Sequence, residues 1–177
     1  MDIFGANYSF MKILVVGSQD NLNEFKEKFT AKHEYTFADD YSFGSETLFG
    51  SDIIFDFAIG DSPEQFGRYA EYSGTLFVNA PKISLAELAF YQEEISCHLF
   101  GFNGLPTFLN RSKFEVSCYQ GEKDLEVLCQ QLGTEFTKVD DRVGMVTPRV
   151  VSMIVNEAFY TLQEGTASIE DIDKGMK

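Results

Sequence analysis

The sequence predicts a doubly wound α/β fold, with a mostly parallel sheet between two layers of helices and a short C-terminal helical segment. Short apolar runs alternate with amphipathic stretches as far as residue 139. The runs are almost continuously apolar, which is typical of parallel strands buried on both faces. A long amphipathic pattern without strand-like runs follows them. We therefore expect a sheet domain over residues 11–139 and a helical segment over residues 140–177.

The expected elements follow one another in a regular order. The run MKILVVG at residues 11–17 predicts the first buried strand. Further strands are expected at residues 35–38, 51–59, 75–79, 97–102, 113–119 and 135–139. Helices are expected at residues 21–32, 63–72, 84–94, 122–132, 143–163 and 168–177. This alternation of strands with helices indicates βαβ units and a parallel sheet.

Several residues support the expected helix ends. Pro63 stands where a first helical turn tolerates proline, and Gly133 is a usual residue just after a helix. Ser168, followed three positions later by Asp171, is typical of a capping box. These signals favour helices at residues 63–72, 122–132 and 168–177.

The composition limits the class of protein. The chain has 177 residues, 44% of them hydrophobic, which suits one domain with its own core. Its net charge is -14, so we expect neither nucleic acid nor an anionic membrane as a partner. No apolar stretch is long enough to span a membrane and no signal-peptide pattern opens the chain. We therefore expect a cytoplasmic protein, in which residues 1–10 form a short extension or Met11 is an alternative start.

The three cysteines, Cys97, Cys118 and Cys129, indicate no redox or metal chemistry. Their number is odd and no CxxC spacing occurs, so we expect neither a disulfide framework nor a zinc site. The Asp and Glu residues show no metal-ligand spacing either. We expect three plain buried thiols and no metal.

The C-terminal sequence NEAFYTLQEGTASIEDIDKGMK, at residues 156–177, resembles the start of the C-terminal domain of the 3-hydroxyacyl-CoA dehydrogenase family. That family carries NEA, EG-x-AS and DID-x-AMK at the corresponding places. The resemblance extends backward over NAPKISLAELA at 79–89 and LFGFNGLP at 99–106, and more weakly over 51–59 and 114–116. It covers most of residues 11–177 and implies a Rossmann domain, an NAD cofactor and a 3-hydroxyacyl-CoA substrate.

The residues that would bind NAD depart from the family pattern. Family members carry G-x-G-x-x-G after the first strand, where the glycines let the backbone approach the pyrophosphate at a helix N-terminus. The three positions are Gly17, Gln19 and Leu22 here, and we expect the Gln19 side chain to stand where a phosphate would rest. The resemblance therefore implies NAD with weak or absent binding. The remaining candidate cofactor-binding residues are Gly17, Asp39 (with Asp40 as the alternative acid) and Asn79.

The resemblance also implies a catalytic His oriented by a Glu, and this pair is incomplete. The His position falls on Phe100, which cannot move a proton, whereas the Glu position is kept as Glu115. His98 lies two residues before Phe100, on the same face of the strand, and is the candidate for a shifted base. Ala80, Pro81 and Lys82 replace the family's Ser and Thr. The candidate substrate residues are Lys82, which is also a second candidate base, and Asn103.

These departures leave two main hypotheses of function. The first is a divergent relative with weak or lost NAD-dependent oxidoreductase activity, retained as a binding or dimerising domain. The second is an active NAD-dependent 3-hydroxyacyl-CoA dehydrogenase with a rearranged site, acting on a substrate like 3-hydroxybutyryl-CoA. A binding function unrelated to dehydrogenation is a third class. An acyl-CoA remains a candidate ligand.

The C-terminal helices predict a homodimer. Their apolar side chains cover much of the helix surface, in a segment too short to form its own core, so we expect a second copy to cover them. In the family, further helices continue this domain and close the active-site cleft, whereas this sequence stops at Lys177. We therefore expect half of the cleft wall to be absent unless a partner supplies it.

Overall fold

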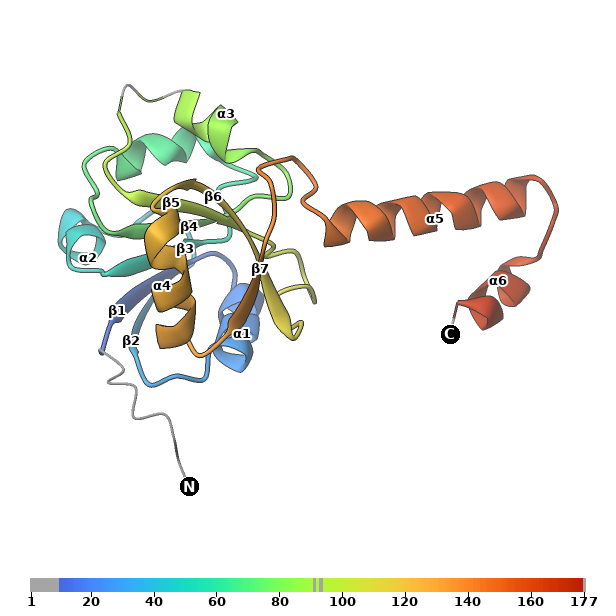
Figure 1. Cartoon of the computed structure of the whole chain (residues 1–177), viewed down its shortest axis with the longest axis horizontal. Coiled ribbons are helices and arrows are strands. Elements are labelled where there is room, and N and C mark those ends of the chain that lie inside the picture. The colour runs from blue at the N-terminus through green and yellow to red at the C-terminus, as the bar shows by residue number, and fades with distance from the viewer. Residues whose placement is uncertain (1–9, 91, 93, 177) are drawn as a thin grey trace. The chain divides into compact units, whose positions relative to one another are not determined.

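The computed structural model describes residues 10–90, 92 and 94–176, and it divides into a sheet unit up to Met145 and a helical unit, Val146–Lys177 (Figure 1). Residues 140–145 belong to the sheet unit because the Asp141 carboxylate accepts the backbone N–H groups of Leu85 and Ala86. The Gly144 N–H donates to the Pro81 carbonyl, 2.8 Å away. The extension expected at residues 1–10 lies, except for its last residue, outside the described residues.

Seven strands form one sheet in the order β2-β1-β3-β4-β5-β6-β7. The strands are β1 (Lys12–Val16), β2 (Glu34–Ala38), β3 (Ile53–Asp56), β4 (Thr75–Asn79), β5 (His98–Phe102), β6 (Lys113–Gln120) and β7 (Glu135–Lys138). All neighbours pair in parallel except β5 and β6. The expected doubly wound, mostly parallel sheet is therefore confirmed.

The helices of the sheet unit connect these strands. They are α1 (Gln19–Lys28), α2 (Ser45–Phe49), the 3-10 helix η1 (Pro63–Tyr69), α3 (Leu85–Phe90), the 3-10 turn η2 (Glu122–Asp124) and α4 (Leu125–Gln131). The expected helix at 63–72 is a 3-10 helix rather than an α-helix. It contains Gly67, and glycine has a low propensity for the α-helix. Helix α2 was not predicted, because its five residues are too few to show a periodic pattern.

Apolar clusters lie on both faces of the sheet. Residues of α1 and α4 pack on one face and residues of α2, η1 and α3 on the other. The cluster on the face covered by α1 and α4 is rich in phenylalanine. Its fully buried phenylalanines are Phe25, Phe29, Phe55, Phe77, Phe100, Phe102 and Phe114. The rings of Phe55 and Phe77 stack with their centroids 4.7 Å apart. Such packing rigidly holds the strand ends from which the candidate site is built.

The helical unit consists of α5 (Thr147–Gln163) and α6 (Ile169–Gly175). Ser168 caps α6, because its Oγ accepts the Asp171 N–H, as the sequence predicts. Helix α5 exposes a set of apolar side chains that α6 does not bury: Val150, Met153, Ile154, Val155, Phe159, Tyr160 and Leu162. No helix among the described residues is long and apolar enough to cross a membrane.

Candidate functional site

The sheet changes its direction of winding between β1 and β3, and a crevice for a ligand is expected at the carboxyl ends of these strands. Gly17 follows β1 and Phe57 follows β3, and the Phe57 N–H donates to the Val16 carbonyl. Phe57 is buried, and its ring packs edge-on against Phe102 with centroids 4.9 Å apart. A Cβ on Gly17 would lie 2.9 Å from the Phe57 Cβ. Phe57 therefore fills the space beside Gly17.

The N-terminus of α1 is closed by its own side chains. The Asn21 Oδ1 accepts both the Ser18 N–H and the Ser18 hydroxyl at 2.9 Å. In return, the Ser18 Oγ accepts the Asn21 N–H at 3.2 Å. A helix N-terminus binds a phosphate through backbone N–H groups that have no other partner. Two of the N–H groups at this turn are already satisfied from within the chain.

This turn does not fit the pyrophosphate of a dinucleotide. Gly17 keeps a φ of 153°, a conformation that favours glycine, but the Asn21 side chain lies 2.9 Å from where a Cβ on Gly17 would be. Gln19, whose side chain we expect where a phosphate would rest, takes no part in the Ser18–Asn21 hydrogen bonds. It is exposed, and its Nε2 donates to Asn23 Oδ1 at 3.1 Å. Asn21 closes the turn instead, and it lies at a variable position of the glycine pattern, so the pattern does not draw attention to it.

The acids at the end of β2 face solvent. Asp39 and Asp40 are both exposed. The Asp40 Oδ1 accepts the Ser42 N–H at 2.7 Å, and hydrogen bonds from Ser42 lower the pKa of Asp40. This turn directs the next residue, Tyr41, inward to β3. The structure thus places Asp39 just after β2, where a ribose-binding acid would stand.

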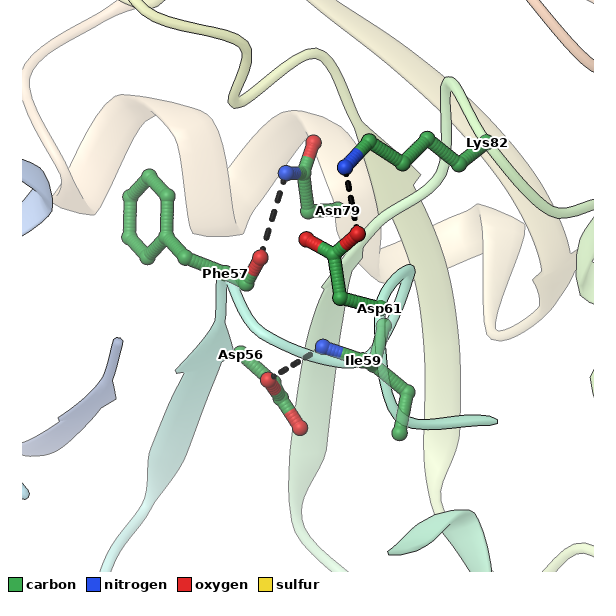
Figure 2. Close-up of polar contacts among 6 residues, drawn as sticks. All are labelled: Asp56, Phe57, Ile59, Asp61, Asn79 and Lys82. Carbon is green, nitrogen blue, oxygen red and sulfur yellow. Dashed lines mark hydrogen bonds and ion pairs between the residues drawn. The ribbon is translucent and has the colours of Figure 1, made fainter. Parts of the chain in front are cut away.

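Asp56, at the end of β3, is a fully buried carboxylate. It accepts hydroxyl hydrogens from Tyr41 at 2.9 Å and Tyr69 at 2.8 Å, and backbone N–H groups from Ala58 and Ile59. Figure 2 shows the bond from Ile59. Burial raises the pKa of Asp56 to about 6, although these hydrogen bonds oppose the rise. This cluster fastens the loop after β2 and the helix η1 to β3.

Asn79 joins two loops at the carboxyl edge of the sheet. Its Nδ2 donates to the Phe57 carbonyl at 3.2 Å (Figure 2). Its Oδ1 accepts the Gly104 N–H at 2.9 Å. The side chain is buried. Asn79 therefore holds the loops after β3 and β5 together, and its amide is engaged with backbone groups.

Lys82 and Asp61 form an ion pair at the same edge. The Lys82 Nζ lies 2.5 Å from the Asp61 Oδ1, and the two side chains are 50% and 69% exposed (Figure 2). Gly60 lets them approach Asn79, because a Cβ there would lie 3.2 Å from the Asn79 carbonyl oxygen and 3.4 Å from the Lys82 Cβ. Asp61 was not predicted as a site residue. A partner for Lys82 cannot be read from a sequence in which the two residues belong to different loops.

Asn103 and Glu115, two candidate site residues that the sequence does not pair, come together across β5 and β6. The Asn103 Nδ2 donates to the Glu115 Oε2 at 3.3 Å, and the Asn103 N–H donates to the Glu115 carbonyl at 3.3 Å. Phe100, at the expected His position, is fully buried and stacks on Phe77 with centroids 5.0 Å apart. Glu115 is thus hydrogen-bonded to the Asn103 amide, and the buried ring of Phe100 stands in place of the His that Glu115 would orient.

His98 does not join this site. It begins β5 opposite Thr75, whereas Phe102 ends β5 opposite Asn79. Since a strand rises about 3.3 Å per residue, these two positions are roughly 13 Å apart. The His98 Nδ1 lies instead 3.5 Å from the Asp124 Oδ2. Sharing a strand face with Phe100 therefore does not bring His98 to Glu115, and the shifted base expected from the sequence is not assembled.

The cysteines show no activated thiol. Burial raises the pKa of Cys97 to about 11 and that of Cys129 to about 12, and it also raises the pKa of Cys118. None of the three forms a disulfide. Within the described part of the chain, no group of three or more His, Cys, Asp or Glu residues is placed to hold a metal ion.

Comparison with known proteins supports a relationship at the C-terminus. Residues 144–177 match the family model for the 3-hydroxyacyl-CoA dehydrogenase, C-terminal domain. The chain is 46% identical over 48 residues to the 3-hydroxyadipyl-CoA dehydrogenase of Escherichia coli (strain K12). It is 39% identical over 54 residues to the probable 3-hydroxybutyryl-CoA dehydrogenase of Bacillus subtilis (strain 168). These matches cover 27% and 30% of this chain, and only 10% and 19% of the two relatives.

The likeness in fold is wider than the likeness in sequence. The crystal structure of (S)-3-hydroxybutyryl-CoA dehydrogenase from Ralstonia eutropha superimposes with a TM-score of 0.67 at 19% sequence identity. The match covers 96% of this chain and 77% of that one. The chain is thus similar in sequence to the 3-hydroxyacyl-CoA dehydrogenase family over its C-terminal segment, and nearly its whole length has the fold of one solved 3-hydroxybutyryl-CoA dehydrogenase.

Proposed function

We propose that this chain is a divergent relative of the 3-hydroxyacyl-CoA dehydrogenases whose NAD-dependent oxidoreductase activity is weak or lost, and that it serves as a binding and dimerising domain. The closed turn after β1 carries this proposal. There the Ser18 N–H, a donor that would otherwise be free for a phosphate, binds the Asn21 side chain. A phosphate that entered would have to displace hydrogen bonds worth about 1 kcal/mol each.

The state of the proton-transfer residues supports the same proposal. A general base must lie within hydrogen-bond reach of the proton it removes. The position of the family's His is occupied by Phe100 in the core, and His98 lies at the other end of β5. Glu115 therefore has no imidazole to orient. Asn79, a candidate cofactor residue, is engaged with the backbone of two loops.

We propose a second copy of the chain as the partner. The exposed apolar residues of α5 form the surface for it, because isolated apolar side chains are common on monomers but a continuous set along one helix is not. We place the protein in the cytoplasm, with neither nucleic acid nor membrane as a partner, in keeping with its net charge of -14. An acyl-CoA is the candidate small ligand, with Lys82 as the cation available to its phosphates.

The alternative is an active NAD-dependent 3-hydroxyacyl-CoA dehydrogenase with a rearranged site. One observation favours it: the Asn103–Glu115 pair is assembled, and Lys82 lies at the same carboxyl edge of the sheet. In that case Lys82 replaces the missing His as base, and a substrate like 3-hydroxybutyryl-CoA is expected. Lys82 would first have to leave Asp61.

Calorimetric titration of the purified chain with NAD and NADH separates these two functions. The proposed function predicts no heat of binding and no shift of the melting temperature at millimolar cofactor. Binding at micromolar cofactor would overturn it. Reduction of acetoacetyl-CoA by NADH, abolished in Lys82→Ala and kept in His98→Ala, would establish the alternative.

A further inference from the structure

The outer edge of β7 is open to another strand. Among the described strands, β7 pairs only with β6. The Val139 N–H donates to the Val116 carbonyl at 2.8 Å, so Val139 faces β6. Residues two positions apart in a strand direct their backbone groups to the same side, so Thr137 also faces β6. Phe136 and Lys138 therefore direct their N–H and C=O groups away from the sheet, where a further strand can bind them.

A groove runs along this edge, between α4 and β7. One cavity of about 710 Å³ is lined by η2, the start of α4, Phe136 and Lys138. A second cavity of about 280 Å³ is lined by the middle of α4 and by Glu135 and Phe136. Both include Glu126 and Phe136, so they lie in line along the whole of β7. We call this feature the α4–β7 groove.

The α4–β7 groove has an apolar floor and an acidic rim. Leu125 and Cys129 are buried, and Phe136 is half-buried against the same core cluster. The rim carries the carboxylates Glu122, Asp124, Glu126 and Glu135 and the ammonium groups Lys123 and Lys138. Lys138 is neutralised by an ion pair with Glu122. Asp124, which also lies 3.5 Å from the His98 ring, Glu126 and Glu135 then outnumber Lys123, so the rim of this chain of net charge -14 attracts a cation and repels an acidic segment.

We propose that the α4–β7 groove binds an extended, lysine- or arginine-bearing peptide segment of a partner protein, which adds to β7 as the next strand. A groove between a helix and an open strand edge is a recurring mode of peptide recognition. Apolar side chains of the segment contact the apolar floor, and its lysine or arginine side chains contact the acids of the rim. Because β7 has four residues, only a few backbone hydrogen bonds form, and the affinity is weak, on the order of 100 μM.

The test uses the whole chain and a fluorescein-labelled peptide of alternating lysine and valine, with a peptide of alternating glutamate and valine as the matched control. Fluorescence anisotropy at low salt measures binding. We expect the lysine peptide to bind at least tenfold more tightly than the glutamate peptide. In amide NMR spectra, we expect the signals of Phe136 and Lys138 to shift most strongly on addition of the lysine peptide.

Two substitutions at Lys138 separate backbone pairing from simple charge attraction. Lys138→Pro removes the outward N–H, which β6 does not use, so an edge strand tolerates it. Lys138→Ala removes the same charge but keeps the N–H. We expect Lys138→Ala to bind the lysine peptide as well as the original chain does, or better, and Lys138→Pro to bind it at least fivefold more weakly. Circular dichroism checks that both variants are folded.

The proposal is overturned if the two Lys138 variants bind the lysine peptide equally, or if the glutamate peptide binds as tightly as the lysine peptide. It is also overturned if Phe136 and Lys138 are already protected from hydrogen exchange in a dimer, because a second copy then occupies the edge. Should Lys138→Pro fail to fold, Glu126→Lys provides the test. It lies on the exposed side of α4, and we expect it to weaken binding of the lysine peptide by at least threefold.

Discussion

Asn21 closes the turn after β1, because its side-chain oxygen accepts hydrogen bonds from both the N–H and the hydroxyl of Ser18. We predict that Asn21→Ala and Ser18→Ala each lower the free energy of unfolding by about 1 kcal/mol, since each removes half of a capping box. Only Asn21→Ala leaves the Ser18 N–H without a partner. Titration with inorganic pyrophosphate should therefore detect binding in Asn21→Ala and none in Ser18→Ala, and equal behaviour of the two would contradict the role given to Asn21.

Asp56 makes stability depend on pH. Its pKa is about 6 in the folded chain against an ordinary value of 3.8, so the folded state binds the proton more tightly than the unfolded state does. The stability that this group contributes is present below pH 3.8 and is lost as the pH rises through about 6. Asp56→Asn cannot lose a proton. We predict that the free energy of unfolding of Asp56→Asn, relative to that of the original chain, rises by roughly 1–2 kcal/mol from about pH 5 to about pH 7. Urea unfolding at the two pH values measures this difference.

A difference that stays constant with pH would show that Asp56 keeps one protonation state throughout. Asp52→Asn is a suitable comparison, since Asp52 is exposed and accepts the Lys12 N–H at 2.8 Å.

Phe100 cannot simply be replaced by the residue that the family resemblance expects. The side chain is fully buried and stacks on Phe77, so an imidazole there loses packing and leaves ring nitrogens unpaired. We predict that Phe100→His costs about 3 kcal/mol of stability in urea unfolding and adds no acetoacetyl-CoA reduction. Phe100→Leu, which only loses packing, should cost about 1–2 kcal/mol. A gain of reductase activity in Phe100→His would contradict this account.

At the scale of elements, the strands were well predicted, whereas helix α2 was missed and the helix expected at 63–72 is the 3-10 helix η1. A continuous apolar run such as that of β3 is a strong local signal, because every one of its residues is buried by the two layers of helices. Helix α2 and the 3-10 character of η1 are set by packing on the sheet, which the local sequence does not record. The hydrogen bonds of Asp56 are not local either, because Tyr41 follows β2 and Tyr69 belongs to η1.

For the candidate site, the sequence named most of the residues but did not predict their contacts. Alternation along a strand predicts which face His98 shares, yet the distance along the strand removes it from Glu115. Asn79 was predicted as a cofactor ligand, whereas the backbone carbonyl of Phe57 and the N–H of Gly104 occupy its amide. Such non-local bonds depend on how loops after neighbouring strands meet, and a single sequence does not show that.

For the whole molecule, the apolar surface of α5 predicts self-association. Met153 and Phe159 are 64% and 68% exposed, so a charge placed on either is tolerated within the chain and is costly in a dimer interface. We predict a dimer by light scattering at micromolar concentration, converted to a monomer by Met153→Glu with unchanged circular dichroism. Ser152→Glu, the same charge on the adjacent polar position, should remain a dimer. A monomeric original chain would contradict the proposal.

The order of strands in the sheet has a consequence for synthesis on the ribosome. β1 lies between β2 and β3, and Ile53 of β3, which pairs with Ile13 of β1, is made long after it. Until β3 emerges, one side of a strongly apolar strand has no neighbour, and a nascent chain in that state is exposed to wrong pairing. The growing polypeptide is therefore most vulnerable in its first third, when a chaperone that shields extended apolar segments would have the most effect.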